Sequence, residues 1–334
     1  MAAPPTPPPL LYLDAAAVEA AMPPLAERLR LAEATMTALI ADAQLPPKLG
    51  VHPRPPGSFA HAMPAWLGTR DDPDGSGDLL GLKWVAGYPA NGGAGLPAIH
   101  ATVVLNDAAT GVPVALLDGG PITAQRTAAV SGLAIRGWAP SRGGPPRAAL
   151  IGAGVQGRSH LPVLGALLPG VRVTVFDRHA DRAAALALAA AATPGIAAAD
   201  IGPSAEATVA EADVVITAVS FGTPRQTMTS DWFRPQALVV AVDYDSCCAA
   251  SVARNAALFL VDDRPQFLAT RAAGSFADYP DPGMTLGEAL LAATPRPAGQ
   301  VLATHLGVGL ADVIFGAAIV ARARALGLGQ ILHR

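Results

Sequence analysis

The sequence predicts an α/β fold in which a doubly wound parallel sheet forms one domain and an α+β region forms a second. Strand-like and helix-like segments alternate from Arg147 onward, which is typical of a parallel sheet covered by helices. Short β-type runs broken by Pro and Gly precede them, and a Pro/Gly-rich linker at residues 139–147 separates the two parts. With 334 residues, 51% of them hydrophobic, the chain is long enough for two cores and is not mainly disordered.

Charge and cysteine content exclude several classes of protein. A formal net charge of -3 indicates no dense basic patch, so we expect no nucleic-acid partner. Cys247 and Cys248 are adjacent and poorly placed to bridge each other or to build a metal site. The apolar segments are too short or too interrupted to cross a membrane, and the first ten residues lack the basic region of a secretory signal. We therefore expect a soluble, cytoplasmic protein without a metal.

The first part of the chain mixes helices and strands. Apolar residues recur at helical spacing within 15–43, and β-type runs follow from Lys48 to Leu117. The segment Asn106–Pro113 predicts a hairpin connection, and Thr123–Trp138 predicts a helix. A last helix, about Leu306 to Leu326, is amphipathic enough to pack back on this part. The predicted domains are residues 1–139 with 306–334, and residues 140–305.

The second part begins with a strand, a glycine-rich turn and a helix. Gly152-x-Gly154-x-x-Gly157 would allow a tight turn, a close approach of backbone N–H groups to a pyrophosphate, and close packing of helix on strand. The next strand ends in Asp177, about 20 residues after the last glycine, where a carboxylate accepts hydrogen bonds from an adenosine ribose. This order predicts a Rossmann-type, dinucleotide-binding domain. Its other predicted strands are Val214–Val219 and Ala237–Val242, and its second predicted helix is Arg182–Ala192.

Two residues at the end of the second predicted strand of this domain, Asp177 and Arg178, bear on the choice between NAD(H) and NADP(H). Asp177 favours NAD(H), because a carboxylate repels a 2′-phosphate, whereas Arg178 directly after it would bind that phosphate and leaves NADP(H) as an alternative. Ser220 is either a contact to the nicotinamide half or a plain strand-end cap. The predicted cofactor contacts from this domain are Gly152, Gly154, Val155, Gln156, Asp177, Arg178, Thr217, Val219 and Ser220.

Fixed cations in the first part predict a small anionic substrate. Lys48, His61, Lys83 and Arg126 lie in otherwise apolar, glycine-rich sequence, and Arg binds a carboxylate in bidentate fashion. Arg54 lies in a Pro-rich turn and is expected at the surface. A substrate carboxylate is therefore the predicted ligand of this region.

Several motifs together resemble the ornithine cyclodeaminase/mu-crystallin family. They include Lys83-Trp-Val-Ala-Gly-Tyr-Pro-Ala-Asn, Ile122-Thr-Ala-Gln-Arg-Thr-Ala-Ala and Ile151-Gly-Ala-Gly-Val-Gln. The resemblance extends from about Pro46 to the helix that contains Asp312. It implies a homodimer, with a discontinuous substrate-binding and dimerisation domain and a Rossmann domain for NAD(P)(H).

The resemblance also assigns roles to individual residues. Lys83 and Arg126 match the family's binders of the substrate carboxylate, and Arg126 also lies near the cofactor. Lys48 lies where the cyclodeaminase has an arginine and the archaeal alanine dehydrogenase has an active-site lysine. A partly desolvated lysine among cations exchanges protons near neutral pH, so Lys48 is either catalytic, as proposed also for Lys83, or only a carboxylate contact.

Three further positions concern the nitrogen and the side chain of the substrate. Asp245 matches the aspartate that manages the amine proton in the cyclodeaminase, although Asp243 is a rival and either acid is alternatively a helix N-cap. His61 replaces a glutamate that recognises the ornithine side chain, which removes the partner of a distal ammonium. His305 is expected near the nicotinamide, with a structural role as the alternative.

These residues predict an NAD(H)-dependent oxidoreductase acting on the C–N bond of a small α-imino or α-amino acid, as an imine (ketimine) reductase or an amino-acid dehydrogenase. Two alternatives remain. One is an ornithine or lysine cyclodeaminase, and the other is a non-catalytic, mu-crystallin-like protein that binds NADPH.

Overall fold

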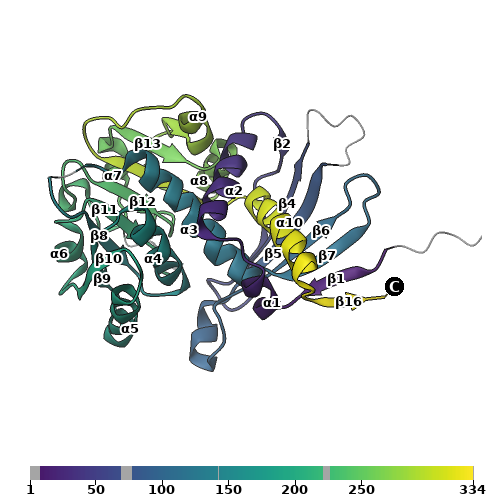
Figure 1. Cartoon of the computed structure of the whole chain (residues 1–334). Coiled ribbons are helices and arrows are strands. Elements are labelled where there is room, and N and C mark those ends of the chain that lie inside the picture. Colours follow the sequence, from purple (N-terminus) through teal and green to yellow (C-terminus); the bar gives the residue numbers. More distant parts are fainter. Residues whose placement is uncertain (1–7, 69–76, 142, 221–225, 334) are drawn as a thin grey trace, which may run out of the picture. The chain divides into compact units, whose positions relative to one another are not determined.

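The chain folds into two compact units. The structure is a computed structural model, and it describes residues 8–68, 77–141, 143–220 and 226–333. One unit comprises residues 1–126 with 308–334, and the other comprises 127–307 (Figure 1). The predicted domains, residues 1–139 with 306–334 and residues 140–305, stay a prediction. Helix α3 (Gly119–Trp138) contributes residues to both compact units.

The first unit contains a mainly antiparallel sheet with strand order β16-β1-β7-β6-β5-β4-β2, in which β3 also pairs with β4. Only β1 and β7 pair in parallel among the strands described in this sheet. The predicted hairpin at 106–113 is confirmed, since β6 and β7 are antiparallel and Asp107 accepts a hydrogen bond from the backbone N–H of Thr110. The elements are β1 (Leu10–Leu13), α1 (Ala15–Ala20), α2 (Leu25–Ala38), β2 (Ala43–Gln44), β3 (Leu49–Val51), β4 (Phe59–Leu67), β5 (Leu79–Gly87), the 3-10 helix η1 (Pro89–Ala94), β6 (Ile99–Asn106), β7 (Pro113–Asp118), α10 (Gly309–Leu326) and β16 (Gln330–Leu332).

Helix α10 covers one face of this sheet. It packs across β4, β5 and β6 and against α2 (Figure 1). Gly309 lets the helix approach β4, because a Cβ there would lie 2.3 Å from the carbonyl oxygen of Met63. Met63, Lys83 and Val103 are register partners on this covered face and are all buried. Successive side chains of a strand point to opposite faces, so Trp84 lies on the other face and is 46% exposed.

The second unit is the predicted doubly wound parallel sheet, with strand order β10-β9-β8-β11-β12-β15-β13-β14. The order reverses at β8, which has β9 on one side and β11 on the other, so the carboxyl ends of β8 and β11 flank the point where such folds bind ligands. The elements are β8 (Arg147–Ile151), α4 (Val155–Leu167), β9 (Val171–Phe176), α5 (Ala180–Ala191), β10 (Ile196–Ile201), α6 (Ala205–Val209), β11 (Val214–Thr217), the 3-10 helix η2 (Ser230–Trp232), β12 (Leu238–Ala241), α7 (Ala250–Asn255), β13 (Leu258–Val261), α8 (Arg264–Ala272), β14 (Met284–Thr285), α9 (Leu286–Leu291) and β15 (Val301–Thr304).

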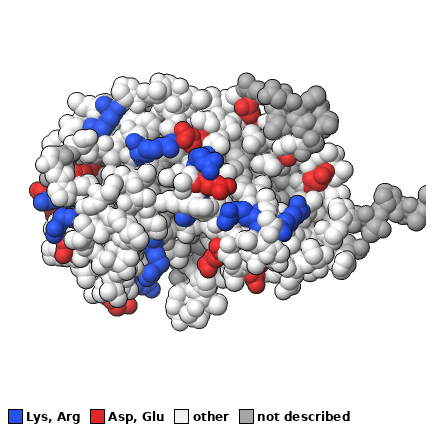
Figure 2. Space-filling view, in the orientation of Figure 1, with Lys and Arg blue, Asp and Glu red and all other residues white. Residues whose placement is uncertain are grey.

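The core strands of this unit are apolar on both faces. All four residues of β11, β12 and β15 are buried, which is the pattern of a sheet with helices on each side. On the visible face of the molecule, Lys and Arg side chains are interspersed with Asp and Glu among many uncharged residues (Figure 2). Within the part of the chain that the structure describes, no helix combines the length and the hydropathy needed to cross a membrane.

Candidate active site

Two cations and one carboxylate form a buried cluster in the first unit. Lys83, from β5, is 1% exposed and places its Nζ 2.7 Å from Oδ2 of Asp312 on α10. Arg126, from α3, is 5% exposed and donates from Nε to Oδ1 of the same carboxylate at 3.3 Å. The structure therefore brings together two of the predicted carboxylate binders, Lys83 and Arg126, around an acid that has no solvent exposure.

This cluster alters the acidity of Lys83. Burial first, and then the nearby Arg126 guanidinium, lower the pKa of Lys83 to about 7, while Asp312 opposes the shift. A buried lysine of this kind changes its charge near neutral pH, as a residue that exchanges protons must.

His61 and Lys48 belong to the same electrostatic neighbourhood. His61, on β4, is half-buried and stacks on Phe59 with ring centroids 4.7 Å apart. Burial first, and then the charges of Lys48, His52 and Lys83, lower the pKa of His61 to about 4. His61 is therefore neutral at pH 7, and the charged groups that influence it are basic.

Asp312 is a functional candidate that sequence reasoning did not assign. It is a single acid within an otherwise apolar stretch of α10, and it lies 186 positions from Arg126. The only available signal was the rarity of a carboxylate inside an apolar helix, because a fully buried acid is rare unless it is paired.

The three glycines of the turn between β8 and α4 differ in the space around them. Gly152 adopts a φ of +104°, and a Cβ there would lie 2.5 Å from the carbonyl oxygen of Ala218. A Cβ on Gly157 would lie 2.3 Å from the carbonyl oxygen of Gly152, whereas one on Gly154 would meet nothing within 4 Å. The two outer glycines are thus required by packing, and Gly154 borders open space where backbone N–H groups at the start of α4 would hold a pyrophosphate. Val155 is exposed on the same turn.

Asp177 is located directly after β9, as predicted. Its Oδ2 accepts a hydrogen bond of 2.7 Å from the backbone N–H of Ala153, and its Oδ1 accepts one from His179. The acid therefore adjoins the glycine-rich turn, where an adenosine ribose binds in this fold. Arg178 is exposed, and its Nε lies 3.1 Å from Nε2 of His179.

The two candidate acids after β12 have different partners. Asp243 accepts from the Thr217 hydroxyl at 2.7 Å and from the Val219 backbone N–H at 3.1 Å, and burial raises its pKa to about 6. Asp245 is 4% exposed and accepts on Oδ2 from Gln226 at 3.0 Å and from the Phe276 backbone N–H at 2.6 Å. Asp243 therefore accepts hydrogen bonds on both carboxylate oxygens from residues at the end of β11 and just after it. The two hydrogen bonds of Asp245 are both accepted by its Oδ2.

The remaining predicted cofactor contacts differ in exposure. Thr217 is fully buried, its hydroxyl donates to Asp243, and its carbonyl oxygen accepts from the backbone N–H of Val242. Val219 is half-buried, and Ser220 is exposed. His305 directly follows β15 and is 2% exposed, with its Nε2 2.8 Å from the Ser131 hydroxyl.

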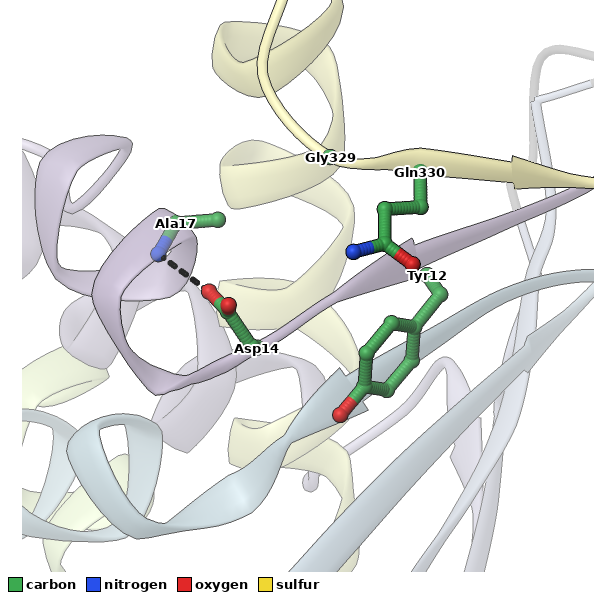
Figure 3. Close-up of a pocket in the computed structure, with 5 residues that line it drawn as sticks. All are labelled: Tyr12, Asp14, Ala17, Gly329 and Gln330. Atoms are coloured by element: carbon green, nitrogen blue, oxygen red, sulfur yellow. Dashed lines mark hydrogen bonds between the residues drawn. The ribbon is translucent and has the colours of Figure 1, made fainter.

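A separate surface pocket lies at the end of β1 in the first unit. It is lined by Tyr12, Asp14, Ala17, Gly329 and Gln330 (Figure 3). Asp14 caps helix α1 by accepting from the backbone N–H of Ala17 at 2.8 Å. None of the residues that the sequence predicts for the active site lines this pocket.

Comparisons with known proteins agree with the architecture and with the motifs. The profile of the ornithine cyclodeaminase/mu-crystallin family matches residues 14–267. The nodulation efficiency protein NfeD of Rhizobium meliloti is 34% identical over 86% of this chain and 87% of its own length.

Two further similarities concern proteins with named chemistry. The Δ1-pyrroline-2-carboxylate/Δ1-piperideine-2-carboxylate reductase of Azospirillum brasilense is 36% identical over 57% of this chain, and the chain spans 60% of that protein. The structure of Δ1-pyrroline-2-carboxylate reductase from Thermococcus litoralis, in complex with NADH and L-proline, has the same fold, with a TM-score of 0.83 and 24% identity over 96% of this chain and 99% of that one.

Proposed function

Because the chain belongs to the ornithine cyclodeaminase/mu-crystallin family, we propose that it is an NAD(H)-dependent oxidoreductase that reduces the C=N bond of a small α-imino acid. The cluster of Lys83, Arg126 and Asp312 carries this proposal. With both basic groups protonated, two positive charges face one negative charge, so the cluster keeps a net positive charge for a substrate carboxylate. Cyclic imines such as Δ1-pyrroline-2-carboxylate, named for the Azospirillum relative, are the proposed substrate class.

The second unit would hold the dinucleotide through its glycine-rich turn. Gly152, Gly154, Val155 and Gln156 would face the pyrophosphate, and Asp177 would bind the ribose, which favours NAD(H) over NADP(H). The other proposed contacts to the cofactor are Arg126, Arg178, Thr217, Val219, Ser220 and His305. When bound, the reduced nicotinamide supplies the hydride for the reaction.

The chain's own residues would bind and orient the substrate. Lys83 and Arg126 would grip the carboxylate through charge-assisted hydrogen bonds, each contributing about 1.5–3 kcal/mol. Lys48 would either exchange a proton during the reaction or only contact the same carboxylate. Asp245 would stabilise the protonated imine nitrogen, because its Oδ2 is held in place by Gln226 and Phe276. His61, neutral at pH 7, would face an uncharged side chain of the substrate.

We also propose that the protein is a homodimer that assembles through the face of the first sheet opposite α10. Leu49, Ala62, Trp84 and Thr102 are successive register partners on that face, and Val51 lies beside them. Leu49, Val51 and Trp84 are 60%, 59% and 46% exposed. A contiguous exposed apolar surface of this kind is typical of a protein interface. A cytoplasmic location is proposed as well, because a chain with only two cysteines, Cys247 and Cys248, fits a reducing compartment.

A substrate panel tests the proposed activity. Oxidation of NADH, and of NADPH in parallel, is followed with Δ1-pyrroline-2-carboxylate, Δ1-piperideine-2-carboxylate, and 2-oxo acids mixed with ammonia or methylamine. We expect the fastest turnover with a cyclic imine and NADH. Conversion of ornithine to proline and ammonia without net NADH would instead make the protein a cyclodeaminase. Absence of turnover with every compound, together with tight NADPH binding, would indicate a crystallin-like binding protein.

A further inference from the structure

Left-handed backbone is concentrated around Asp245 in the second unit. Among the described residues, those with a positive φ that are not glycine are Gln226, Tyr244, Phe276, Asp278 and Ala293. Tyr244, with a φ of +61°, precedes Asp245 in the sequence. Gln226 and Phe276, with φ of +47° and +55°, are the two residues that donate hydrogen bonds to this acid. A side chain makes this conformation unfavourable, and such residues gather at functional sites where the surrounding structure holds them.

The two donors occupy one oxygen of Asp245. Nε2 of Gln226 donates to Oδ2 at 3.0 Å, and the backbone N–H of Phe276 donates to the same oxygen at 2.6 Å. Asp245 is 4% exposed, and no residue that the structure describes donates a hydrogen bond to its Oδ1. An oxygen that accepts two N–H bonds has both of its lone pairs engaged. A hydrogen bond from this acid to a ligand therefore involves Oδ1, whether the acid is the donor or the acceptor.

Backbone hydrogen bonds hold Gln226 beside the acid. The N–H of Gln226 donates to the carbonyl oxygen of Ser246 at 3.3 Å, and the N–H of Met228 donates to that of Cys247 at 3.0 Å. Because these bonds join two segments side by side, the carboxamide of Gln226 reaches Oδ2 from a fixed backbone position.

The turn that contains Phe276 is held from several sides. Phe276 is 0% exposed, and its ring stacks on that of Tyr244 with centroids 5.7 Å apart. The backbone N–H of Tyr279 donates to the carbonyl oxygen of Phe276 at 3.1 Å, and the Tyr279 hydroxyl donates to that of Cys248 at 2.8 Å. Arg271 donates to the carbonyl oxygen of Tyr279 at 3.0 Å. These contacts stabilise the left-handed conformation that directs the Phe276 N–H to the acid.

We propose that Gln226 and Phe276 are positioning residues that hold Asp245 with Oδ1 directed to the nitrogen of the substrate, and that the left-handed backbone around the acid is retained for this purpose. The role toward the nitrogen rests on the proposed function, whereas the orientation of the carboxyl group does not. Asp245 follows β12, at the carboxyl edge of the parallel sheet where open α/β sheets bind their ligands. Asp243 instead accepts hydrogen bonds from the unit on both of its oxygens.

Crystal structures of the full-length parent and of Gln226→Met, both without ligands, test the orientation. Methionine has a similar length but no N–H donor. We expect Oδ2 of Asp245 within hydrogen-bond distance of both donors in the parent, and a rotated or doubly placed carboxyl group in the variant. A parent in which Gln226 does not reach Asp245 would overturn the proposal, as would a variant in which the carboxyl group keeps the parent orientation.

Kinetics with a cyclic imine and NADH test the role toward the substrate. Gln226→Met should lower kcat about ten- to hundredfold and change the KM for the imine less than about threefold, because the acid is misplaced while the cations that bind the carboxylate are unchanged. The rate is expressed per NADH-binding site, so that a loss of folded protein does not lower it. Gln226→Asn, whose amide is one methylene too short to reach Oδ2, should behave in the same way.

Two glycine variants separate the backbone conformation from its function. Gln226 and Ala293 both have a φ of +47°, which glycine adopts without strain. Ala293 is exposed just after α9, so Ala293→Gly should leave kcat unchanged and should not lower the Tm. Gln226→Gly should lose kcat as Gln226→Met does, with a smaller decrease in Tm, because the relaxed backbone offsets part of the lost hydrogen bond. A parent-like kcat in Gln226→Gly would contradict the proposal.

The outcomes distinguish this inference from the proposed function. If the parent reduces a cyclic imine and Gln226→Met keeps kcat within about twofold of it, the proposed function stands and the inference is wrong. If the parent reduces no imine while the crystal structures show the expected change of orientation, the proposed function fails, and the role of Oδ1 toward the substrate nitrogen fails with it.

Discussion

At the scale of single residues, Asp312 determines what the two cations beside it contribute. A carboxylate with no solvent exposure is stable only because Lys83 and Arg126 both reach it. Removing the acid leaves two basic groups facing each other in the interior. The same acid keeps Lys83 partly charged, since it opposes the effects of burial and of Arg126 on the pKa of that lysine.

Replacing Asp312 by Asn should therefore destabilise the protein strongly. We expect the free energy of unfolding to fall by about 3–5 kcal/mol, the usual effect of breaking a buried ion pair from one side. Urea denaturation measures the change. Asp200→Asn is the matched control, because Asp200 pairs with Arg172 at 3.8 Å with both side chains more than half exposed, and its loss should cost less than about 1 kcal/mol. Equal losses for the two variants would contradict a buried cluster.

The pKa of Lys83 predicts how binding depends on pH. Lys83 is charged below about pH 7 and neutral above it, so affinity for a carboxylate should fall as the pH rises through this value. A bound carboxylate raises the pKa of Lys83, which moves the midpoint upward. The inhibition constant of cyclopentanecarboxylate, measured from pH 6.5 to 9, should rise about ten- to hundredfold, since one charge-assisted hydrogen bond is lost. Lys83→Met should bind weakly at every pH in this range, and an unchanged profile in that variant would assign the titration to another group.

At the scale of elements, the glycines of the turn between β8 and α4 differ in whether the packing of the fold requires them. Gly157 and Gly152 are needed because a side chain there would collide with backbone atoms. Gly154 has free space around it, so the packing of the fold does not require its small size.

Gly154→Ala should thus fold normally and bind NADH poorly. We expect the Tm to stay within about 2 °C of the parent and the Kd for NADH to rise at least tenfold, because the new methyl group would occupy the space of the pyrophosphate. Fluorescence titration with NADH measures the affinity. Gly137→Ala, in α3 and also with nothing within 4 Å of the added Cβ, is the control and should bind NADH as the parent does. Unaltered NADH affinity in Gly154→Ala would place the cofactor elsewhere.

Local sequence signals predicted the ligand-binding elements better than the connections between them. The strand, glycine turn, helix and Asp177 were found because their spacing is set within one continuous segment. Helix α3 was expected to begin at Thr123 and begins at Gly119. The helix includes Pro121 because proline is tolerated in the first turn, and a Cβ at Gly119 would lie 2.7 Å from that of Ala101.

Contacts between residues far apart in the sequence could not be predicted from local sequence patterns. Val301–Thr304 is too short for periodicity to identify it as a strand, and the sheet alone makes it one. Asp312 had no local partner to reveal its role, because the groups that it binds come from β5 and α3. The roles of Asp243 and Asp245 stay predictions, since both carboxylates are buried and hydrogen-bonded.

At the scale of the whole molecule, the open face of the first sheet is the feature most directly linked to assembly. Trp84→Glu places a charge in the middle of the proposed interface. We expect a dimeric parent and a monomeric variant by sedimentation velocity, because an unpaired charge buried in an interface core is strongly unfavourable. Leu188→Glu is the control, since Leu188 is 75% exposed on α5 and should leave the dimer intact. A parent that sediments as a monomer would contradict the proposed dimer.

The pairing of β16 with β1 has a consequence for the order in which the units fold during synthesis. Strand β16 pairs with β1, and α10 brings Asp312 to Lys83, so residues 309–332 are required to finish the unit that begins with β1. During translation the segment 127–307 emerges complete and is able to fold first. Until residues 309–332 have been synthesised, Lys83 lacks its counter-ion and β1 lacks its partner β16.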